Sequence, residues 1–87
     1  LPYVWGENLK RGTRNNKDVF ALQTALAFQF FYPPNTKDKN DCPINGSFGP
    51  CTEKAVISFQ KSYGIKPSSG FVGPTARSKL NELYPAR

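Results

Sequence analysis

The feature that most constrains the fold is a short run, residues 45–60, in which a turn leads directly into an amphipathic segment. It reads Asn-Gly-Ser-Phe-Gly-Pro-Cys-Thr-Glu-Lys-Ala-Val-Ile-Ser-Phe-Gln. Asn45-Gly46 is typical of a tight turn with positive φ, because glycine reaches that backbone region at no steric cost. In Gly49-Pro50, the proline presets φ for the first residue of a helix. The run therefore predicts a helix that starts at Pro50.

Beyond this proline, the side chains are distributed as on a helix with one buried face. Five of them recur at helical spacing and would share that face: Thr52, Ala55, Val56, Phe59 and Tyr63. Phe48, in the turn before the helix, offers an aromatic anchor. Gly64 is suited to end the helix in the left-handed conformation. We expect the helix to lie against a core from Pro50 to about Tyr63.

Two further segments show the same helical period. A first helix is expected over residues 18–32, stopped by Pro33-Pro34, and a third over residues 74–84, ended by Pro85. The predicted core faces are Val19, Leu22, Leu26 and Phe30 on the first helix and Leu80, Leu83 and Tyr84 on the third. The sequence thus predicts an all-α fold, a small three-helix bundle with Gly-Pro turns before helices 2 and 3.

Three stretches of the chain resemble the peptidoglycan-binding domain family, a small three-helix cell-wall module. Residues 45–60 resemble its turn and second helix, with the pattern Gly-x-Phe-Gly, Pro, x-Thr, Ala-Val and Phe-Gln. Residues 9–26, with Leu-x-x-Gly, Asp-Val and Ala-Leu-Gln, resemble its opening turn and first helix. Residues 70–83 resemble its closing turn, Gly-x-Val-Gly-Pro, and third helix. One departure is Ala76, where the family usually has threonine.

This resemblance implies a non-catalytic module that binds peptidoglycan, or an anionic polymer of the bacterial cell wall, outside the cell. The candidate ligand-binding residues are Asn45, Ser47, Thr52, Tyr63, Arg11 and Arg14. The first three are polar groups beside the turn, and the tyrosine offers a stacking surface. The two arginines are suited to pair with carboxylates or phosphates of stem peptides and polymers.

No catalytic residue is predicted. The chain has no histidine, so general acid–base chemistry would fall to its six carboxylates. Helix capping explains Asp18 ahead of the first helix, and the helix dipole explains Glu53 in the first turn of the second. Gln23 and Gln60 are expected to satisfy buried backbone groups rather than to hold sugar.

The two cysteines, Cys42 and Cys51, lie on either side of the Asn45-Gly46 turn. A disulfide between them would close a short loop and fix the entry into the second helix, and disulfides persist in oxidising compartments. A reduced pair without a role and a metal site are the alternatives. With no histidine and no further cysteine, a four-ligand zinc site cannot be assembled, and no cofactor is expected.

Twelve lysine and arginine residues against six acids give a net charge of +6. This charge favours polyanions such as wall polymers, lipid headgroups or nucleic acid. The densest cluster, Lys10, Arg11, Arg14 and Lys17, precedes the first helix and contains no aromatic side chain. A solvated basic loop is the plainer interpretation of this cluster. Without stacking platforms, we expect no sequence-specific binding of nucleic acid.

We divide the chain into an apolar N-terminal arm (residues 1–8), the three-helix domain (residues 9–84) and a tail (residues 85–87). A chain of 87 residues is expected to form one domain with a modest core. No run of about 18 apolar residues predicts a membrane span. Because methionine is absent and the first five residues are too short for a signal peptide, we expect a processed or excised part of an exported protein.

Phe20, Phe28 and Phe31 fall outside the predicted core face of the first helix. The apolar arm is expected to cover them. Alternatively, these phenylalanines and Trp5 form a contact surface for other protein subunits. In that case the chain would be an extracellular self-assembling or structural subunit that uses the same fold for protein contacts.

Overall fold

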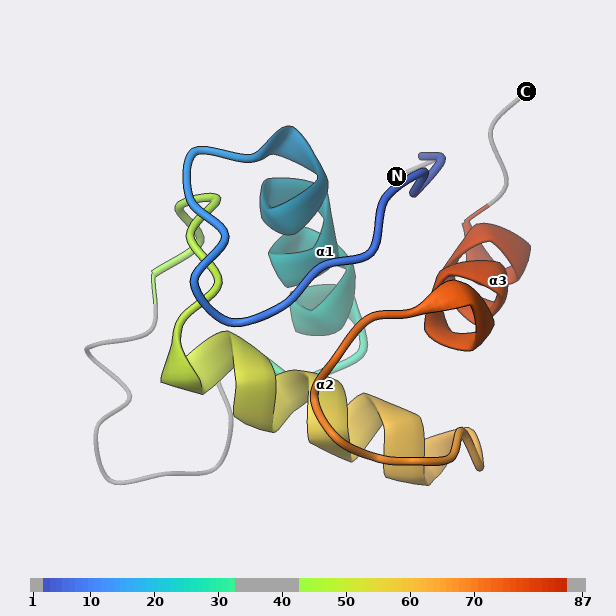
Figure 1. The fold of residues 1–87 in the computed structure, drawn as a ribbon. Coiled ribbons are helices and arrows are strands. Elements are labelled where there is room, and N and C mark those ends of the chain that lie inside the picture. Colours follow the sequence, from blue (N-terminus) through green and yellow to red (C-terminus); the bar gives the residue numbers. More distant parts are fainter. Residues whose placement is uncertain (1–2, 33–42, 85–87) are drawn as a thin grey trace.

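The computed structural model describes residues 3–32 and 43–84, in which three helices form the regular structure. They are α1 (Lys17–Phe28), α2 (Pro50–Ser62) and α3 (Pro74–Leu83). In Figure 1, α1 lies above α2, and α3 stands to the right of both. Apart from an isolated antiparallel bridge between Leu9 and Val72, the described residues form no strand. The predicted all-α class and small three-helix bundle are confirmed.

Much of the core comes from segments outside the helices. Trp5, Leu9, Phe48 and Val72 are each at most 2% exposed. The backbones of Leu9 and Val72 exchange hydrogen bonds of 2.9 and 2.8 Å, which tie the segment before α1 to the turn before α3. Phe48 is tied to the same segment, because its carbonyl accepts a hydrogen bond from the Gly12 N–H at 2.9 Å. The extended segment before α1 therefore holds both Gly-Pro turns.

α2 and α3 begin as their Gly-Pro pairs predict. Gly49 and Gly73 are the N-caps, and the prolines that follow occupy the first turn. α1 begins differently, because Asn16 Oδ1 accepts hydrogen bonds from the backbone N–H groups of Asp18 and Val19 at 2.7 and 3.2 Å. The prediction that Asp18 caps α1 is wrong: Asn16 is the cap and Asp18 lies in the first turn.

α1 and α2 end in the same Schellman arrangement. In each, the residue after the C-cap is left-handed, and its N–H and the next N–H bond to carbonyls of the last turn. Gly64 occupies this position in α2 with φ of +68°, as predicted, whereas Phe30 occupies it in α1 with φ of +64°. A left-handed backbone is unfavourable for phenylalanine because its Cβ crowds the following carbonyl.

The left-handed turn at Phe30 makes α1 shorter than residues 18–32. Phe30, predicted in the core, is 92% exposed. Phe31, predicted outside the core face, is half-buried, and its ring centroid lies 6.1 Å from that of Phe59 in an edge-to-face contact. Both predictions are wrong for one reason: the chain leaves the helical register before it reaches the prolines expected to stop it.

The N-terminal arm packs between α1 and α3 (Figure 1). Trp5 donates its indole N–H to the carbonyl of Asp18 at 3.1 Å, and its backbone exchanges hydrogen bonds with the side chain of Asn81 in α3. The Tyr3 hydroxyl donates to the carboxylate of Asp18. Burial, together with this carboxylate, raises the pKa of Tyr3 to about 12. The arm is therefore part of the folded domain.

The arm does not cover the aromatic side chains of α1. Phe20 and Phe28 remain 52% and 64% exposed, so the prediction that the arm shields them is wrong. Trp5 is 1% exposed and belongs to the core rather than to a surface. The exposed aromatic side chains of α1 and its end are thus Phe20, Phe28 and Phe30.

Replacing Phe30 by glycine should raise the free energy of unfolding by up to about 1 kcal/mol. The left-handed backbone costs a non-glycine residue roughly 1–2 kcal/mol, and the greater unfolded-state entropy of glycine offsets about half of that gain. Little packing is lost, since the Phe30 side chain is 92% exposed. Urea denaturation measures the change. Gly64→Ala is the control: it introduces a Cβ at the equivalent left-handed position of α2 and should destabilise the protein. A Phe30→Gly protein less stable than the wild type would contradict the strain assigned here.

Candidate functional site

One buried side chain of α1, Gln23, holds the turn that precedes α2. Its Oε1 accepts hydrogen bonds from the backbone N–H groups of Asn45 and Gly46 at 2.9 and 3.0 Å. Its Nε2 donates to the carbonyl of Ser47 and to the hydroxyl of Thr52, both at 2.9 Å. Gln23 is 0% exposed, so these contacts replace water at buried groups. The expectation that Gln23 satisfies buried backbone groups is confirmed.

Gln60 repeats this arrangement one helix later. Its Oε1 accepts the backbone N–H of Gly70 and its Nε2 donates to the carbonyl of Phe71, both at 2.9 Å. Gly70 has φ of +86°, and a Cβ there would lie 2.6 Å from Cγ of Glu53, so only glycine fits the turn. Ala76 stands where α2 has Thr52, and the second glutamine therefore lacks the hydroxyl partner of the first.

The turn held by Gln23 forms one wall of a cavity of about 490 Å³, which we name the turn pocket. The pocket lies between the segment before α1, the turn before α2 and the first turn of α2. Five predicted ligand-binding residues line it: Arg11, Arg14, Asn45, Ser47 and Thr52. Their common place in the fold follows from the hydrogen bonds that join Gly12 and Thr13 to Phe48. Their role in binding stays a prediction.

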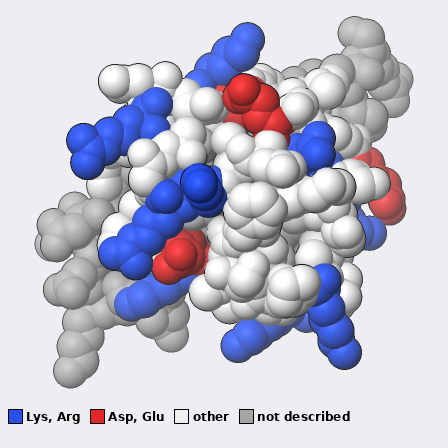
Figure 2. All heavy atoms as spheres, viewed as in Figure 1, with Lys and Arg blue, Asp and Glu red and all other residues white. Residues whose placement is uncertain are grey.

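The turn pocket is positively charged at its rim. Arg11 Nη1 lies 3.6 Å from Glu53 Oε1, and the two side chains are 59% and 33% exposed, so solvent screens this pair and leaves it weak. Arg14 is exposed. Gly49, Pro50 and Cys51 also line the pocket, so the positive end of the α2 dipole faces it, and no side chain caps this helix at Gly49. In Figure 2, basic side chains gather around one acidic side chain on the left of this face.

The polar groups inside the pocket are held in fixed positions. Asn45 Oδ1 accepts the backbone N–H of Ser47 at 3.0 Å, which fixes the amide over the turn. Thr52 is 1% exposed and its hydroxyl is engaged by Gln23, so it forms the floor. Tyr32, which the sequence did not indicate, joins the wall and donates its hydroxyl to the carbonyl of Pro43 at 2.8 Å. Burial raises the pKa of Tyr32, and the phenol stays protonated at neutral pH.

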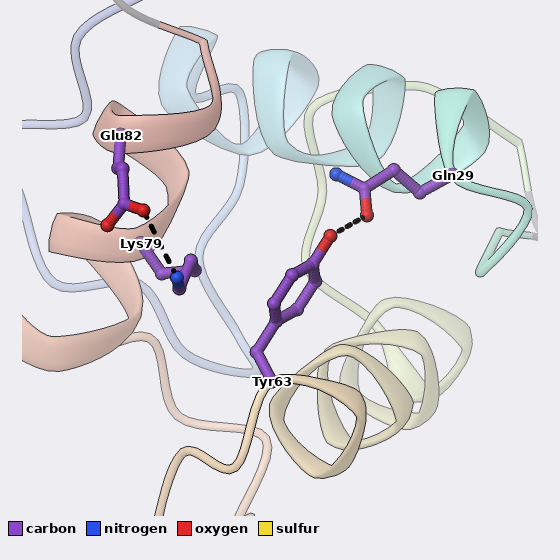
Figure 3. Close-up of polar contacts among 4 residues, drawn as sticks. All are labelled: Gln29, Tyr63, Lys79 and Glu82. Atoms are coloured by element: carbon purple, nitrogen blue, oxygen red, sulfur yellow. Dashed lines mark hydrogen bonds and ion pairs between the residues drawn. The ribbon is translucent and has the colours of Figure 1, made fainter.

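Tyr63 lies apart from the other five predicted ligand-binding residues. Figure 3 shows it at the end of α2, pointing toward Gln29 of the α1 terminus, with Lys79 and Glu82 of α3 nearby. Its hydroxyl donates to Gln29 Oε1 at 2.5 Å, and Lys79 Nζ lies 5.4 Å from its ring centroid. One face of the ring is therefore occupied by a cation from the same chain. Tyr63 lines a separate hollow of about 470 Å³ between α2 and α3.

Three carboxylates of the described residues are engaged by neighbouring side chains. Asp18 accepts from Tyr3, Glu53 pairs with Arg11, and Glu82 pairs with Lys79 at 3.3 Å. Within residues 3–32 and 43–84, no three acidic, cysteine or histidine side chains are grouped so that they could hold a metal ion. Cys51 is half-buried in the first turn of α2, and Cys42 lies outside the described residues, so their predicted bond stays a prediction.

Comparison with known proteins identifies relatives of this domain. Residues 15–80 match a family described as peptidoglycan binding domain. A zinc D-Ala-D-Ala carboxypeptidase of Streptomyces albus G is 33% identical over 81 residues, which cover 93% of this chain and 29% of that protein. The chain spans between 17% and 29% of the curated relatives that it matches.

Two solved structures share the fold. A peptidoglycan-binding protein from Clostridioides difficile, in complex with glutamine hydroxamate, has a TM-score of 0.71 and 32% identity, over 90% of this chain and 42% of that chain. The N-terminal domain of SleB has a TM-score of 0.74 and 26% identity, over 94% of this chain and 99% of that chain.

Replacing Gln23 by alanine should lower the free energy of unfolding by at least about 2 kcal/mol, because several buried groups of the turn lose their partner. Gln60→Ala should have a similar effect for the same reason. Gln29→Ala is the matched control with a smaller loss, since water can replace its partly exposed contacts with Tyr63 and Tyr84. Denaturant unfolding of the three variants tests this order. Equal losses of unfolding free energy in all three variants would show that the turns do not depend on the buried glutamines.

Proposed function

Because this chain belongs to the peptidoglycan binding domain family, we propose that its turn pocket holds an acidic group of the bacterial cell wall. The chain is a peptidoglycan-binding module, and the finer assignment concerns which of its residues meet the wall. The observation that carries it is the convergence of Arg11, Arg14, Asn45 and Ser47 on one cavity beside the uncapped start of α2. Guanidinium groups and helix N-termini both favour carboxylates and phosphates.

The two arginines and the two turn residues contribute to recognition in different ways. Arg11 and Arg14 supply charge at the rim, where long side chains adjust to a flexible polymer. Asn45 and Ser47 lie on a turn whose backbone is fixed by Gln23, so their polar groups need little ordering when a ligand binds. An acidic stem-peptide group seated between rim and turn would meet both sets. A shallow site of this kind is suited to weak binding that becomes firm on a polymer with many copies of the ligand.

The catalytic chemistry of the carboxypeptidase relative is not assigned to this module. That protein is a zinc enzyme, and this chain covers 29% of it. The present chain has no histidine, and its described residues offer no group that could hold a metal ion. We propose a non-catalytic role, in which the module brings whatever is attached to it to the wall.

Association with the cell wall follows from the family, and we propose that the module is exported. No described helix is both long enough and apolar enough to cross a membrane. Export to an oxidising compartment would allow Cys42 and Cys51 to bond. Such a bond would anchor the start of α2, where Cys51 packs against the core beside the turn pocket.

Arg14→Gln should weaken binding to isolated sacculi by roughly two- to fivefold at low salt, as expected for one exposed ion pair. Lys61→Gln removes the same charge from the far end of α2 and should leave binding close to wild type. Co-sedimentation with sacculi over a salt series measures both, with DNA as the control polyanion. Equal loss in the two variants would assign the binding to net charge and remove the turn pocket from it.

The proposed disulfide predicts that neither cysteine reacts with a thiol reagent when the protein is denatured without reductant. Reduction should lower the free energy of unfolding by roughly 2–3 kcal/mol, because the bond closes a short loop in the unfolded chain. Mass spectrometry of the labelled protein checks the first point and urea denaturation the second. Full labelling of both cysteines before reduction would rule the bond out.

A further inference from the structure

A second hollow, of about 530 Å³, adjoins the turn pocket, and we name it the α1 groove. Asn45 lines both hollows, and Gly46 lines the groove. The rest of the groove's lining includes Phe20 and Thr24 of α1 and Tyr3 of the N-terminal arm. The two hollows therefore meet at the turn that precedes α2.

The two hollows differ in charge. Arg11 and Arg14 line the turn pocket, whereas Lys17 is the one charged residue among the described residues that line the α1 groove. The surface of the groove is chiefly apolar, and Phe20, at 52% exposed, supplies an aromatic side chain to it. An anionic group is thus favoured on one side of the turn and an uncharged group on the other.

Amide groups form the polar margin of the α1 groove. Asn15 and Asn45 line it, and both are exposed. Asn45 Oδ1 accepts the backbone N–H of Ser47, while its Nδ2 makes no hydrogen bond with residues 3–32 or 43–84. The groove therefore combines an accessible aromatic side chain with side-chain amides that can both donate and accept hydrogen bonds.

The walls of the α1 groove are fixed to one another by backbone contacts. Asn16, which caps α1, donates its N–H to the carbonyl of Gly46 at 3.2 Å and accepts the N–H of Phe20 at 3.1 Å. Gly46 has φ of +80°, and a Cβ there would lie 3.2 Å from the carbonyl oxygen of Asn16. The turn and α1 are thus in close backbone contact, so a ligand that spans both hollows meets walls already in place.

We propose that the α1 groove is a glycan subsite, which takes the C–H face and the acetamido group of an N-acetylated sugar of peptidoglycan. This inference rests on the proposed function, which seats an acidic stem-peptide group in the turn pocket. The stem peptide is joined covalently to a sugar of the glycan, so adjoining hollows can receive adjoining parts of one polymer. The C–H face of the sugar packs on Phe20, and its polar edge meets the amides of Asn15 and Asn45.

Other occupants fit the α1 groove less well. A stem-peptide carboxylate would be desolvated against a chiefly apolar surface with only Lys17 to pair with, although two arginines stand in the next hollow. A wholly apolar ligand would leave the amide of Asn45 without the hydrogen bonds that water supplies. An uncharged sugar offers both an apolar face and hydrogen-bonding groups.

The probe that isolates the groove is a linear tetramer of N-acetylglucosamine, which carries neither charge nor peptide. In a titration of the 15N-labelled chain, the amide resonances of Phe20, Thr24 and Gly46 should shift. Phe20→Ala should lower the affinity for the tetramer roughly two- to tenfold, as expected for the loss of one ring contact. Phe28→Ala is the matched control, because Phe28 is 64% exposed on the same helix and does not line the groove. Circular dichroism should show that both variants keep the helix content of the wild type.

A synthetic stem peptide with free carboxylates is the second probe, and it separates the groove from the turn pocket. Arg14→Gln should weaken binding of the peptide more than binding of the tetramer, and Phe20→Ala should do the reverse. A wild type that does not bind the tetramer, or equal effects of Phe20→Ala and Phe28→Ala on it, would overturn the glycan subsite and leave the turn pocket standing. Groove resonances that shift with the peptide but not with the tetramer would overturn it as well. A weakened tetramer affinity in Phe20→Ala, with normal peptide binding by Arg14→Gln, would instead remove the acidic group from the turn pocket and keep the subsite.

Discussion

The fold depends on buried carboxamides that span from each helix to the turn ahead of the next. A two-sided group is needed there, because each turn presents backbone N–H groups and a carbonyl to the same side chain. Gln23 meets both with one amide, and Gln60 does so in the second turn. A glutamate would lack the donor and a methionine both functions. The positions of the two turns are therefore set by α1 and α2. The turns in their place determine where α2 and α3 begin.

The two turns share a scaffold but differ where a ligand would act. Thr52 supplies a hydroxyl at the floor of the first, whereas Ala76 leaves the corresponding place in the second apolar and 2% exposed. Arg11 and Arg14 stand beside the first turn, because the segment that carries them is bonded to Phe48. Beside the second turn, Arg77 of α3 donates to Asn8 Oδ1 at 3.0 Å. The repeated turn thus explains the architecture. The differences between the two turns single out the turn pocket as the candidate site.

Local patterns made most of the fold predictable. Proline after glycine marks where α2 and α3 begin, and helical spacing marks Val56, Phe59 and Leu80 as core, because these features depend on a few neighbouring residues. The end of α1 was mispredicted, since a phenylalanine carries no signal for a left-handed turn. Trp5 and Tyr32 were also beyond sequence reasoning, because their partners lie far along the chain.

Charge is unevenly distributed over this small domain. Arg11 and Arg14 line the turn pocket, whereas residues 19–32, from α1 and the turn after it, contain no charged side chain. Arginines at the turn pocket attract an anionic polymer over a distance set by salt. A weak pocket gains most when two copies are held together, because the second binding event on one polymer becomes intramolecular. The charged groups proposed to meet the wall therefore lie beside the turn that Gln23 holds in place, where a modest affinity per module is sufficient.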